Sequence, residues 1–271
     1  MEWFIELSPI MQAFLAGIFT WMMTALGASI VLFIPGVNRK LLNTLQGFAA
    51  GIMIAASFWS LLTPALEFGE KSSSLSWIPA AIGFILGGLL IRSLDFIVPH
   101  SHPSSTQISH KKEGPENKLK DSTLLFLAMT LHNIPEGLAL GVVFGSLNQN
   151  NSESAVLGAI GLAIGMGIQN IPEGAAVSLP LKADGNSSRK SFNLGQLSGI
   201  VEPIFAVIGA FAIVLVTPIL PYALAIAAGA MIYVVVEDLI PSSQSGDNTD
   251  LATLALMIGF VFMMILDVSL G

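Results

Sequence analysis

The chain has 271 residues, of which 53% are hydrophobic and only 11% are charged, and its mean hydropathy is +0.76. Because the apolar residues come in long stretches, this composition predicts an integral membrane protein of the all-α class rather than a soluble domain. The net charge of -7 is accompanied by no basic face or nucleic-acid-binding motif, which excludes nucleic acid as a partner. The absence of cysteine excludes disulfides and thiolate sites, so nitrogen, oxygen or thioether must hold any bound metal.

Eight apolar stretches are long enough to cross a hydrocarbon core of roughly 30 Å, which takes about 20 helical residues. In chain order we expect membrane helices at about 8–34, 41–66, 77–98, 122–146, 154–180, 193–217, 219–240 and 250–270. The first stretch does not resemble a cleaved signal peptide, because Glu2 and Glu6 precede it and its apolar run is too long. We therefore expect one transmembrane domain, residues 1–271, with eight helices.

The polar loop 99–121 separates the third and fourth predicted helices and is rich in His, Ser, Lys and Pro, which predicts a mobile loop. Basic residues fall in this loop and in two others on the same side: Arg39, Lys40, Lys111, Lys112, Lys118, Lys120, Lys182, Arg189 and Lys190. Loops that carry an excess of Lys and Arg face the cytoplasm. The sequence thus predicts a cytoplasmic loop 99–121, both termini outside the cytoplasm, and a multi-pass protein of the plasma (inner) membrane.

Two matching segments, 131–137 and 168–174, place metal-ligand residues and a proline inside predicted membrane helices. In each segment one ligand residue lies four positions before a glutamate, and an asparagine lies three positions before the same glutamate. The three side chains therefore share one helix face. The six residues are His132, Asn133, Glu136, Gln169, Asn170 and Glu173. The prolines lack an N–H group and free a carbonyl, which is tolerated at membrane depth where it lines a wet or ion-filled cavity.

The depth of these residues predicts a single site. At about 1.5 Å per residue, His132, Gln169 and Glu202 all lie near the membrane midplane, and Met53 lies at the same level. Charged groups at that depth cost several kcal/mol unless they are paired, hydrated or bound to an ion. Each glutamate of the two segments has two oxygens and could bridge two cations, as inward-facing glutamates do in carboxylate-bridged bundles.

The ordered set of motifs resembles the ZIP (Zrt-, Irt-like) family of divalent metal transporters, and within it the bacterial GufA-like branch. The resemblance rests on eight spans, His-Asn-Ile-Pro-Glu-Gly in the fourth, its Gln variant in the fifth, and Val201-Glu202-Pro203 in the sixth. It implies a transporter of divalent transition metals, with Zn(II) expected first, that carries its ion into the cytoplasm by a rigid-body sliding of one helix group. It also implies a homodimer, and it implies neither an enzyme nor a bound cofactor.

The resemblance further implies a binuclear metal site. One position would use Met53, His132, Glu136, Gln169 and Glu173, and the other Asn133, Glu136, Asn170, Glu173 and Glu202. Many family members have histidine where this chain has Gln169, which suggests weaker binding or a broader choice of metal here. Five residues near the cytoplasmic ends of the spans suggest a release route: Asp95, His100, His102, Glu237 and Asp238.

Other functions were weighed against metal transport. An intramembrane metalloprotease would need a motif such as His-Glu-x-x-His, which the sequence lacks. A metal-gated channel, or a carrier coupled to protons or another cation, remains an alternative because acidic residues at the midplane can serve protons as well as metals. Met53 could also be an ordinary packing residue, since methionine fills gaps in helix bundles generally.

Overall fold

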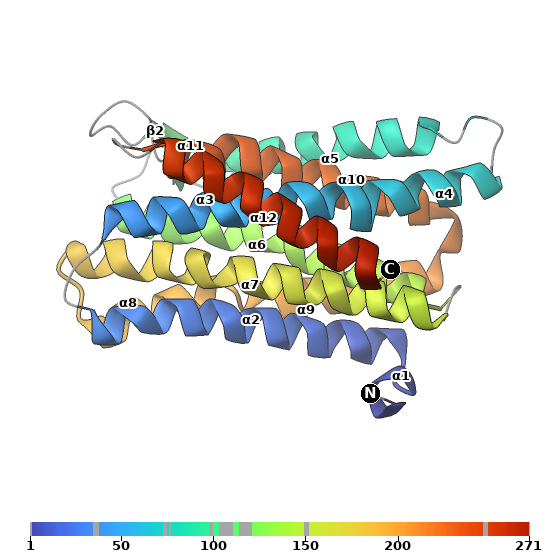
Figure 1. Ribbon diagram of the computed structural model, residues 1–271, viewed down its shortest axis with the longest axis horizontal. Helices are drawn as coiled ribbons and strands as arrows, with labels where there is room; N and C mark the ends of the chain where they lie inside the picture. Colours follow the sequence, from blue (N-terminus) through green and yellow to red (C-terminus); the bar gives the residue numbers. More distant parts are fainter. Residues whose placement is uncertain are drawn as a thin grey trace.

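The computed structural model is a bundle of long helices that run side by side (Figure 1). It describes residues 2–34, 38–72, 75, 77–97, 100–102, 111–113, 121–148, 152–245 and 249–270. Within these residues, eight helical segments are long and apolar enough to cross a membrane. The prediction of an all-α, multi-pass membrane protein with eight spans is therefore confirmed.

The first, third, fourth, fifth and eighth spans are single helices: α2 (Pro9–Phe33), α5 (Trp77–Ile97), α6 (Asp121–Ser146), α7 (Glu153–Ala183) and α12 (Thr249–Leu270). The second span comprises α3 (Arg39–Ala56), η1 (Ser57–Leu62) and α4 (Thr63–Ser72). The sixth span comprises α8 (Ser188–Ser198) and α9 (Val201–Leu215). The seventh span comprises α10 (Leu220–Val234), η3 (Val235–Leu239) and α11 (Ile240–Ser243). A short α1 (Glu2–Ile5) precedes α2, and the 3-10 turn η2 (Thr217–Ile219) precedes α10.

The second and seventh spans each contain a π-helical segment, where the sequence predicts an uninterrupted helix. At the end of each segment an N–H group bonds to the carbonyl five residues earlier, from Thr63 to Phe58 and from Ile240 to Val235. Pro64 and Pro241 follow directly and have no N–H group to continue the ordinary ladder. Such single-turn π segments occur frequently at functional sites.

The sixth span is broken between α8 and α9, where the sequence predicts one helix. The chain leaves α8 at Gly199 and starts α9 at Val201, with the Glu202 N–H bonded to the Gly199 carbonyl at 3.0 Å. Pro203 is in the first turn of α9, where its missing N–H costs nothing. The break places Glu202 in that first turn, where the helix dipole favours a negative charge.

The loop predicted between the third and fourth spans contains a small hairpin. Strand β1 (His100–His102) pairs antiparallel with β2 (Lys111–Glu113), and Ser101 is opposite Lys112. Residues 99, 103–110 and 114–120 of the predicted mobile loop lie outside the described residues. No pattern of residues predicts these strands, because they are short and strongly polar.

The helices associate in two groups. In one group α2 packs along α7, and α6 packs along α9, with further contacts between α2 and both α6 and α9. In the other, α3 packs along α12, and α5 along α10. The two groups meet where α7 contacts α3 and α12, and where α6 contacts α10. All candidate ligands except Met53 belong to the first group.

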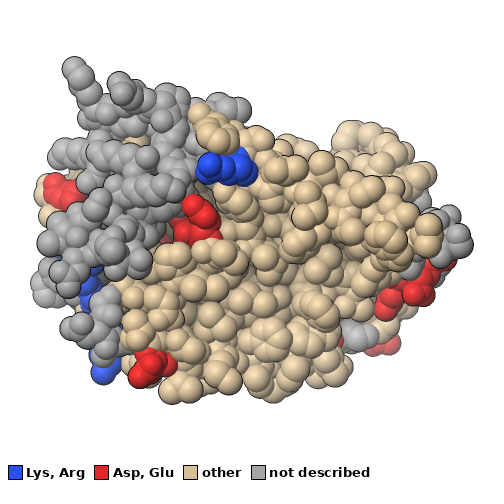
Figure 2. Space-filling model, turned by 90° about the horizontal axis from the view of Figure 1, so that it is seen from above, with Lys and Arg blue, Asp and Glu red and all other residues tan. Residues whose placement is uncertain are grey.

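The two ends of the bundle differ in charge. Both termini lie at one end, while α8, the start of α3 and β2 lie at the other (Figure 1). Figure 2 shows a broad uncharged face with Lys and Arg only toward the end that carries α8 and the strands. We call this the basic end and the opposite end the terminal end.

Candidate functional site

The seven polar candidate ligands of α6, α7 and α9 are all buried within the first helix group. Each has at most 4% of its surface exposed: His132, Asn133, Glu136, Gln169, Asn170, Glu173 and Glu202. Pro135 and Pro172 lie inside helices that continue past them, so the two motifs stay helical and keep their residues on one face. The two motifs therefore bring their polar side chains into the interior of the bundle.

The two repeated motifs are joined by a direct hydrogen bond. Gln169 Nε2 on α7 donates to Glu136 Oε1 on α6 at 2.9 Å. The carboxylates of Glu173 and Glu202 also act electrostatically on Glu136, and both repel it. Three acids that repel one another inside a bundle need a cation or protons among them to remain there.

Glu202 is held by neighbours from two other helices. Asn170 Nδ2 donates to Glu202 Oε2 at 2.8 Å, and Thr24 Oγ1 on α2 donates to Glu202 Oε1 at 3.3 Å. The same Asn170 amide also reaches the Thr20 carbonyl at 3.3 Å. Both oxygens of Glu202 therefore accept a hydrogen bond from the protein.

The break in the sixth span supplies a further contact. Asn133 Nδ2 donates to the Ser198 carbonyl at 2.9 Å, at the last residue of α8. A carbonyl at a helix end has no partner within its helix. Asn133 satisfies it and in turn is fixed beside α9.

Five oxygen atoms of these ligands are buried without any hydrogen-bond partner. They are Asn133 Oδ1, Glu136 Oε2, Gln169 Oε1, Asn170 Oδ1 and Glu173 Oε2. Leaving a buried polar atom unpaired costs about 1–3 kcal/mol, so five in one region call for an explanation. Every one is an acceptor, while the amide nitrogens of the same residues donate to the protein. This donor set suits a cation that prefers oxygen and imidazole ligands.

The site is not a cluster of charged ligands alone. Among the described residues, no group of three or more His, Asp and Glu is arranged so that it could hold a metal ion. The candidate site instead alternates acids with the amides of Asn133, Gln169 and Asn170. Amide oxygens are weaker ligands for zinc than imidazole or thiolate.

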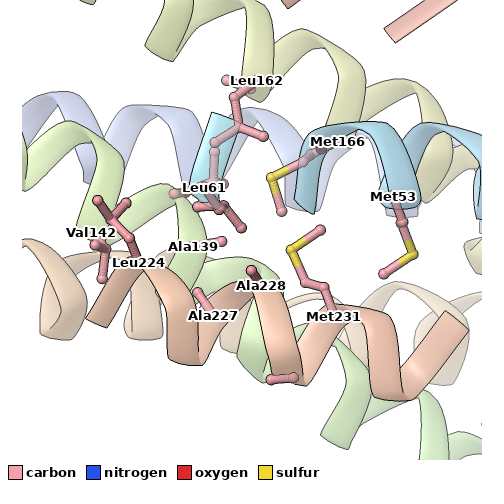
Figure 3. Packing of buried hydrophobic residues seen from close by; sticks show 14 of the residues in the cluster. Met53, Leu61, Ala139, Val142, Leu162, Met166, Leu224, Ala227, Ala228 and Met231 are labelled. Carbon is pink, nitrogen blue, oxygen red and sulfur yellow. The ribbon is translucent and has the colours of Figure 1, made fainter. Parts of the chain in front are cut away.

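Met53 lies on α3, in the other helix group, and is 1% exposed. It belongs to the main hydrophobic cluster, which also contains Met166 and Met231 (Figure 3). Its position fits both the packing role and the thioether-ligand role that the sequence leaves open.

The residues of the predicted release route are placed unevenly. Asp238 is 5% exposed, and its Oδ2 lies 2.8 Å from Nε2 of the candidate ligand His132. Glu237 is half-buried. Asp95 lies on α5, and His100 and His102 lie on β1, but their side chains are outside what the structure describes.

A cavity of about 370 Å³ opens between the two helix groups near the terminal end. It is lined by residues of η1, α4, α6, α7, α10 and α12, including Ser60, Thr63, Glu67 and Asp267. Ser60 Oγ donates to Asp267 Oδ1 at 2.5 Å, and Asp267 Oδ2 is buried without a hydrogen-bond partner. We call this cavity the vestibule. The sequence analysis missed Asp267, although an acid inside a predicted span is itself a functional signal.

Apolar side chains separate the vestibule from the buried acids. Leu61 and Leu162 are fully buried and lie near each other, with Met166 and Met231 beyond them (Figure 3). Along α7, Leu162 follows the vestibule residue Ala159 and precedes Gln169, and ten residues of helix span roughly 15 Å. An ion in the vestibule would therefore have to pass these buried apolar side chains, here called the apolar layer, to reach the acids.

The family model for "ZIP Zinc transporter" matches residues 10–123 and 100–267 of this chain. The chain belongs to the ZIP family. The human protein named zinc transporter ZIP11 is 40% identical to it, over 97% of this chain and 98% of that protein. GufA of Myxococcus xanthus, named a zinc transporter, is 39% identical over 92% and 94% of the two chains. ZIPB of Bordetella bronchiseptica, also named a zinc transporter, is 35% identical over 96% and 81%. These relatives of the ZIP protein are named as transporters rather than enzymes.

Two residues of the first span, which were not predicted from the sequence, also belong to this ZIP site. Thr20 and Thr24 are buried on α2 and contact Asn170 and Glu202, respectively. Their spacing of four residues places them on one helix face. The sequence signal that could have identified these two residues is a pair of hydroxyl side chains on one face of an otherwise apolar helix.

Proposed function

We propose that this ZIP-family protein carries divalent transition-metal ions, with Zn(II) as the expected cargo, across the membrane through the buried site of α6, α7 and α9. The observation that carries the proposal is the set of five buried, unpartnered oxygen atoms on the candidate ligands. An imidazole, carboxylates and amides suit a borderline cation held with modest affinity. The names of the three relatives support zinc in particular.

The proposed site binds two ions. The first position is formed by Met53, His132, Glu136, Gln169 and Glu173, and the second by Asn133, Glu136, Asn170, Glu173 and Glu202. Glu136 and Glu173 serve both positions, which is consistent with one oxygen of each being free of hydrogen bonds to the protein. The ion is the transported substrate, and no further cofactor is proposed.

Transport is proposed to run from the terminal end to the basic end by alternating access. The first helix group would slide as a rigid body along the second and carry the acids past the apolar layer. Two features support this motion: the vestibule lies between the groups, and so does a second cavity of about 160 Å³. The second cavity is lined by apolar residues and glycine beside Pro135, so sliding there would break no polar contacts.

The proposed setting is the plasma (inner) membrane, with the basic end in the cytoplasm and both termini outside. The positive-inside rule supports this orientation, because Arg39, Lys40, Lys182, Arg189 and Lys190 all lie toward one end.

We also propose a homodimer, as the family resemblance implies. Light scattering on the purified protein in detergent would give its mass and test that assembly.

The decisive test of transport is zinc uptake into liposomes that contain the purified protein. With equal pH on both sides and a zinc-sensitive dye inside, the expected result is saturable uptake well above that of empty liposomes. Uptake equal to that of empty liposomes would refute the proposal. A proton-coupled carrier of another substrate would show no zinc flux, and a channel would show flux that does not saturate with zinc concentration.

A further inference from the structure

Thr20 and Thr24 on α2 lie against Glu202, the acid that belongs only to the second proposed ion position. Both threonines are almost completely buried, with 0% and 1% of their surface exposed. Thr24 Oγ1 donates to Glu202 Oε1 at 3.3 Å, and the Thr20 hydroxyl also interacts with that carboxylate. A hydroxyl on a helix can satisfy itself at the carbonyl four residues earlier, so a contact with another helix needs a reason.

The bond of Thr24 to its own helix is longer than that of comparable threonines. Thr24 Oγ1 lies 3.3 Å from the Thr20 carbonyl oxygen. Three other threonines make the same bond at 2.8, 2.8 and 2.9 Å: Thr44, Thr130 and Thr253. Because a hydroxyl has one hydrogen to donate, Thr24 shares its hydrogen between the Thr20 carbonyl and Glu202. The hydroxyl is therefore turned toward the acid.

Asn170 on α7 has the same two partners as Thr24. Its Nδ2 donates to Glu202 Oε2 at 2.8 Å and reaches the Thr20 carbonyl at 3.3 Å. Each oxygen of Glu202 thus accepts from a donor that is also held at the same turn of α2. An ionised carboxylate has about four lone-pair sites, so these bonds orient Glu202 and leave it able to bind an ion. The helices α2, α7 and α9 belong to the first group, so the network would move together with the ion.

Close backbone packing keeps Thr24 in this position. A Cβ atom built on Gly174 of α7 would lie 2.0 Å from the Thr24 carbonyl oxygen, so α2 and α7 are in direct contact there. A Cβ atom built on Gly199, at the break before α9, would lie 2.8 Å from Thr24 Oγ1 and 3.0 Å from Glu202 Oε1. The missing side chain of Gly199 therefore leaves the space in which the hydroxyl and the carboxylate meet.

We propose that Thr24 is a positioning residue that holds the Glu202 carboxylate in place for the second ion. Hydrogen-bond partners of a metal-binding carboxylate fix its orientation, and losing one typically costs roughly 10- to 100-fold in metal affinity. The first ion position does not include Glu202, so its affinity should not depend on Thr24. The inference rests on the proposed function, since it assumes the two-ion site.

The test removes the hydroxyl with Thr24→Val, which nearly keeps the shape of the side chain. Equilibrium dialysis of the purified wild-type protein against zinc should show two ions per chain. In Thr24→Val one ion should bind about tenfold more weakly, and the other should bind as in wild type. Thr24→Ser restores the hydroxyl and should recover wild-type binding. Thr130→Val removes a part-buried hydroxyl that is bonded to the Phe126 carbonyl of its own helix, and it should bind both ions as in wild type.

A second background shows whether Thr24 acts through Glu202. In a Glu202→Ala protein, adding Thr24→Val should leave zinc binding unchanged. Weakening of equal size with and without Glu202 would overturn the inference, as would equal weakening of both ions, no weakening in Thr24→Val, or no recovery in Thr24→Ser. If gel filtration shows that Thr24→Val does not fold, Thr24→Ala should give the same selective weakening. A wild-type protein that binds no zinc would refute the proposed function and this inference together, whereas the other outcomes refute the inference alone.

Discussion

Glu136, Glu173 and Glu202 are all buried acids of one site, but their oxygens are not equally free. Glu202 accepts hydrogen bonds at both oxygens, from Asn170 and Thr24. Glu136 and Glu173 each keep one buried oxygen without a hydrogen-bond partner. The structure thus distinguishes Glu136 and Glu173, each of which has a free oxygen that could bind an ion, from Glu202, whose two oxygens are both held by the protein.

We therefore predict a graded effect of removing these acids. Glu136→Ala and Glu173→Ala should each reduce zinc uptake by about 100-fold or more, which exceeds the roughly 10–100-fold cost of losing a residue that only supports a metal ligand, because each serves both ion positions. Glu202→Ala should leave a measurable fraction of the uptake. Initial rates in liposomes at matched protein content measure this, with gel filtration as the check on folding. Equal loss in all three variants would argue against bridging glutamates.

Gln169 is the site residue where this chain departs from the commoner family pattern. Gln169→His should tighten zinc binding and lower the maximal uptake rate, because imidazole is a stronger zinc ligand than an amide and an ion held more tightly leaves more slowly. Competition of zinc with manganese and cadmium during uptake would give the metal preference. An unchanged affinity and metal order would show that Gln169 does not bind the ion and that its bond to Glu136 is its whole role.

The sequence predicted which candidate ligands share a helix face but not which residues of other helices they contact. The repeated motifs were informative because residues four apart on a helix must share a face, which is a local rule. The contact of His132 with Asp238, and those of Thr20 and Thr24 with α7 and α9, depend on which helices become neighbours. No local sequence pattern determines which helices become neighbours. The metal-binding roles themselves stay predictions.

At the scale of helices, α6 and α9 approach closely beside the site. A Cβ atom built on Gly137 would lie 2.6 Å from the Glu202 carbonyl oxygen and 2.9 Å from its Cα. Both atoms belong to the backbone, so no side chain can move aside. The glycine of the fourth-span motif therefore sets the distance between α6 and Glu202.

Gly137→Ala should push α9 away from α6, at a cost of about 1–3 kcal/mol for overpacking, and should lower both thermal stability and zinc uptake. Gly88→Ala on α5 is the matched control, because its added Cβ would meet nothing nearer than Tyr233 Cδ2 at 3.7 Å. Melting temperatures in detergent and uptake rates of both variants give the comparison. A Gly137→Ala protein as stable and as active as Gly88→Ala would contradict the close approach.

The spans were predictable because hydrophobic length is a strong signal, and all eight appear. The interruptions of these spans could not be predicted from the sequence. The two π segments and the break before α9 depend on Pro64, Pro241 and Pro203, and a proline in a membrane helix can equally be accommodated within it. Pro135 and Pro172 show this, since α6 and α7 continue past both.

For the whole molecule, the orientation in the membrane can be tested with single cysteines, because the chain has none of its own. Asn148 and Asp184 are exposed and lie just beyond opposite ends of the bundle, after α6 and after α7. Asn148→Cys should react with a membrane-impermeant maleimide applied to intact cells, and Asp184→Cys should react only after the membrane is opened. The reverse pattern would invert the proposed direction of transport.

We propose that the transported ion binds among α6, α7 and α9, at the oxygens that have no hydrogen-bond partner in the protein. The most direct measurement is anomalous scattering at the zinc absorption edge from crystals of the protein grown with zinc. We expect peaks within coordination distance of Glu136 and Glu173, with one of the peaks also within coordination distance of His132 or Glu202. Zinc found only in the vestibule or at the loop histidines, with none between α6 and α7, would contradict it.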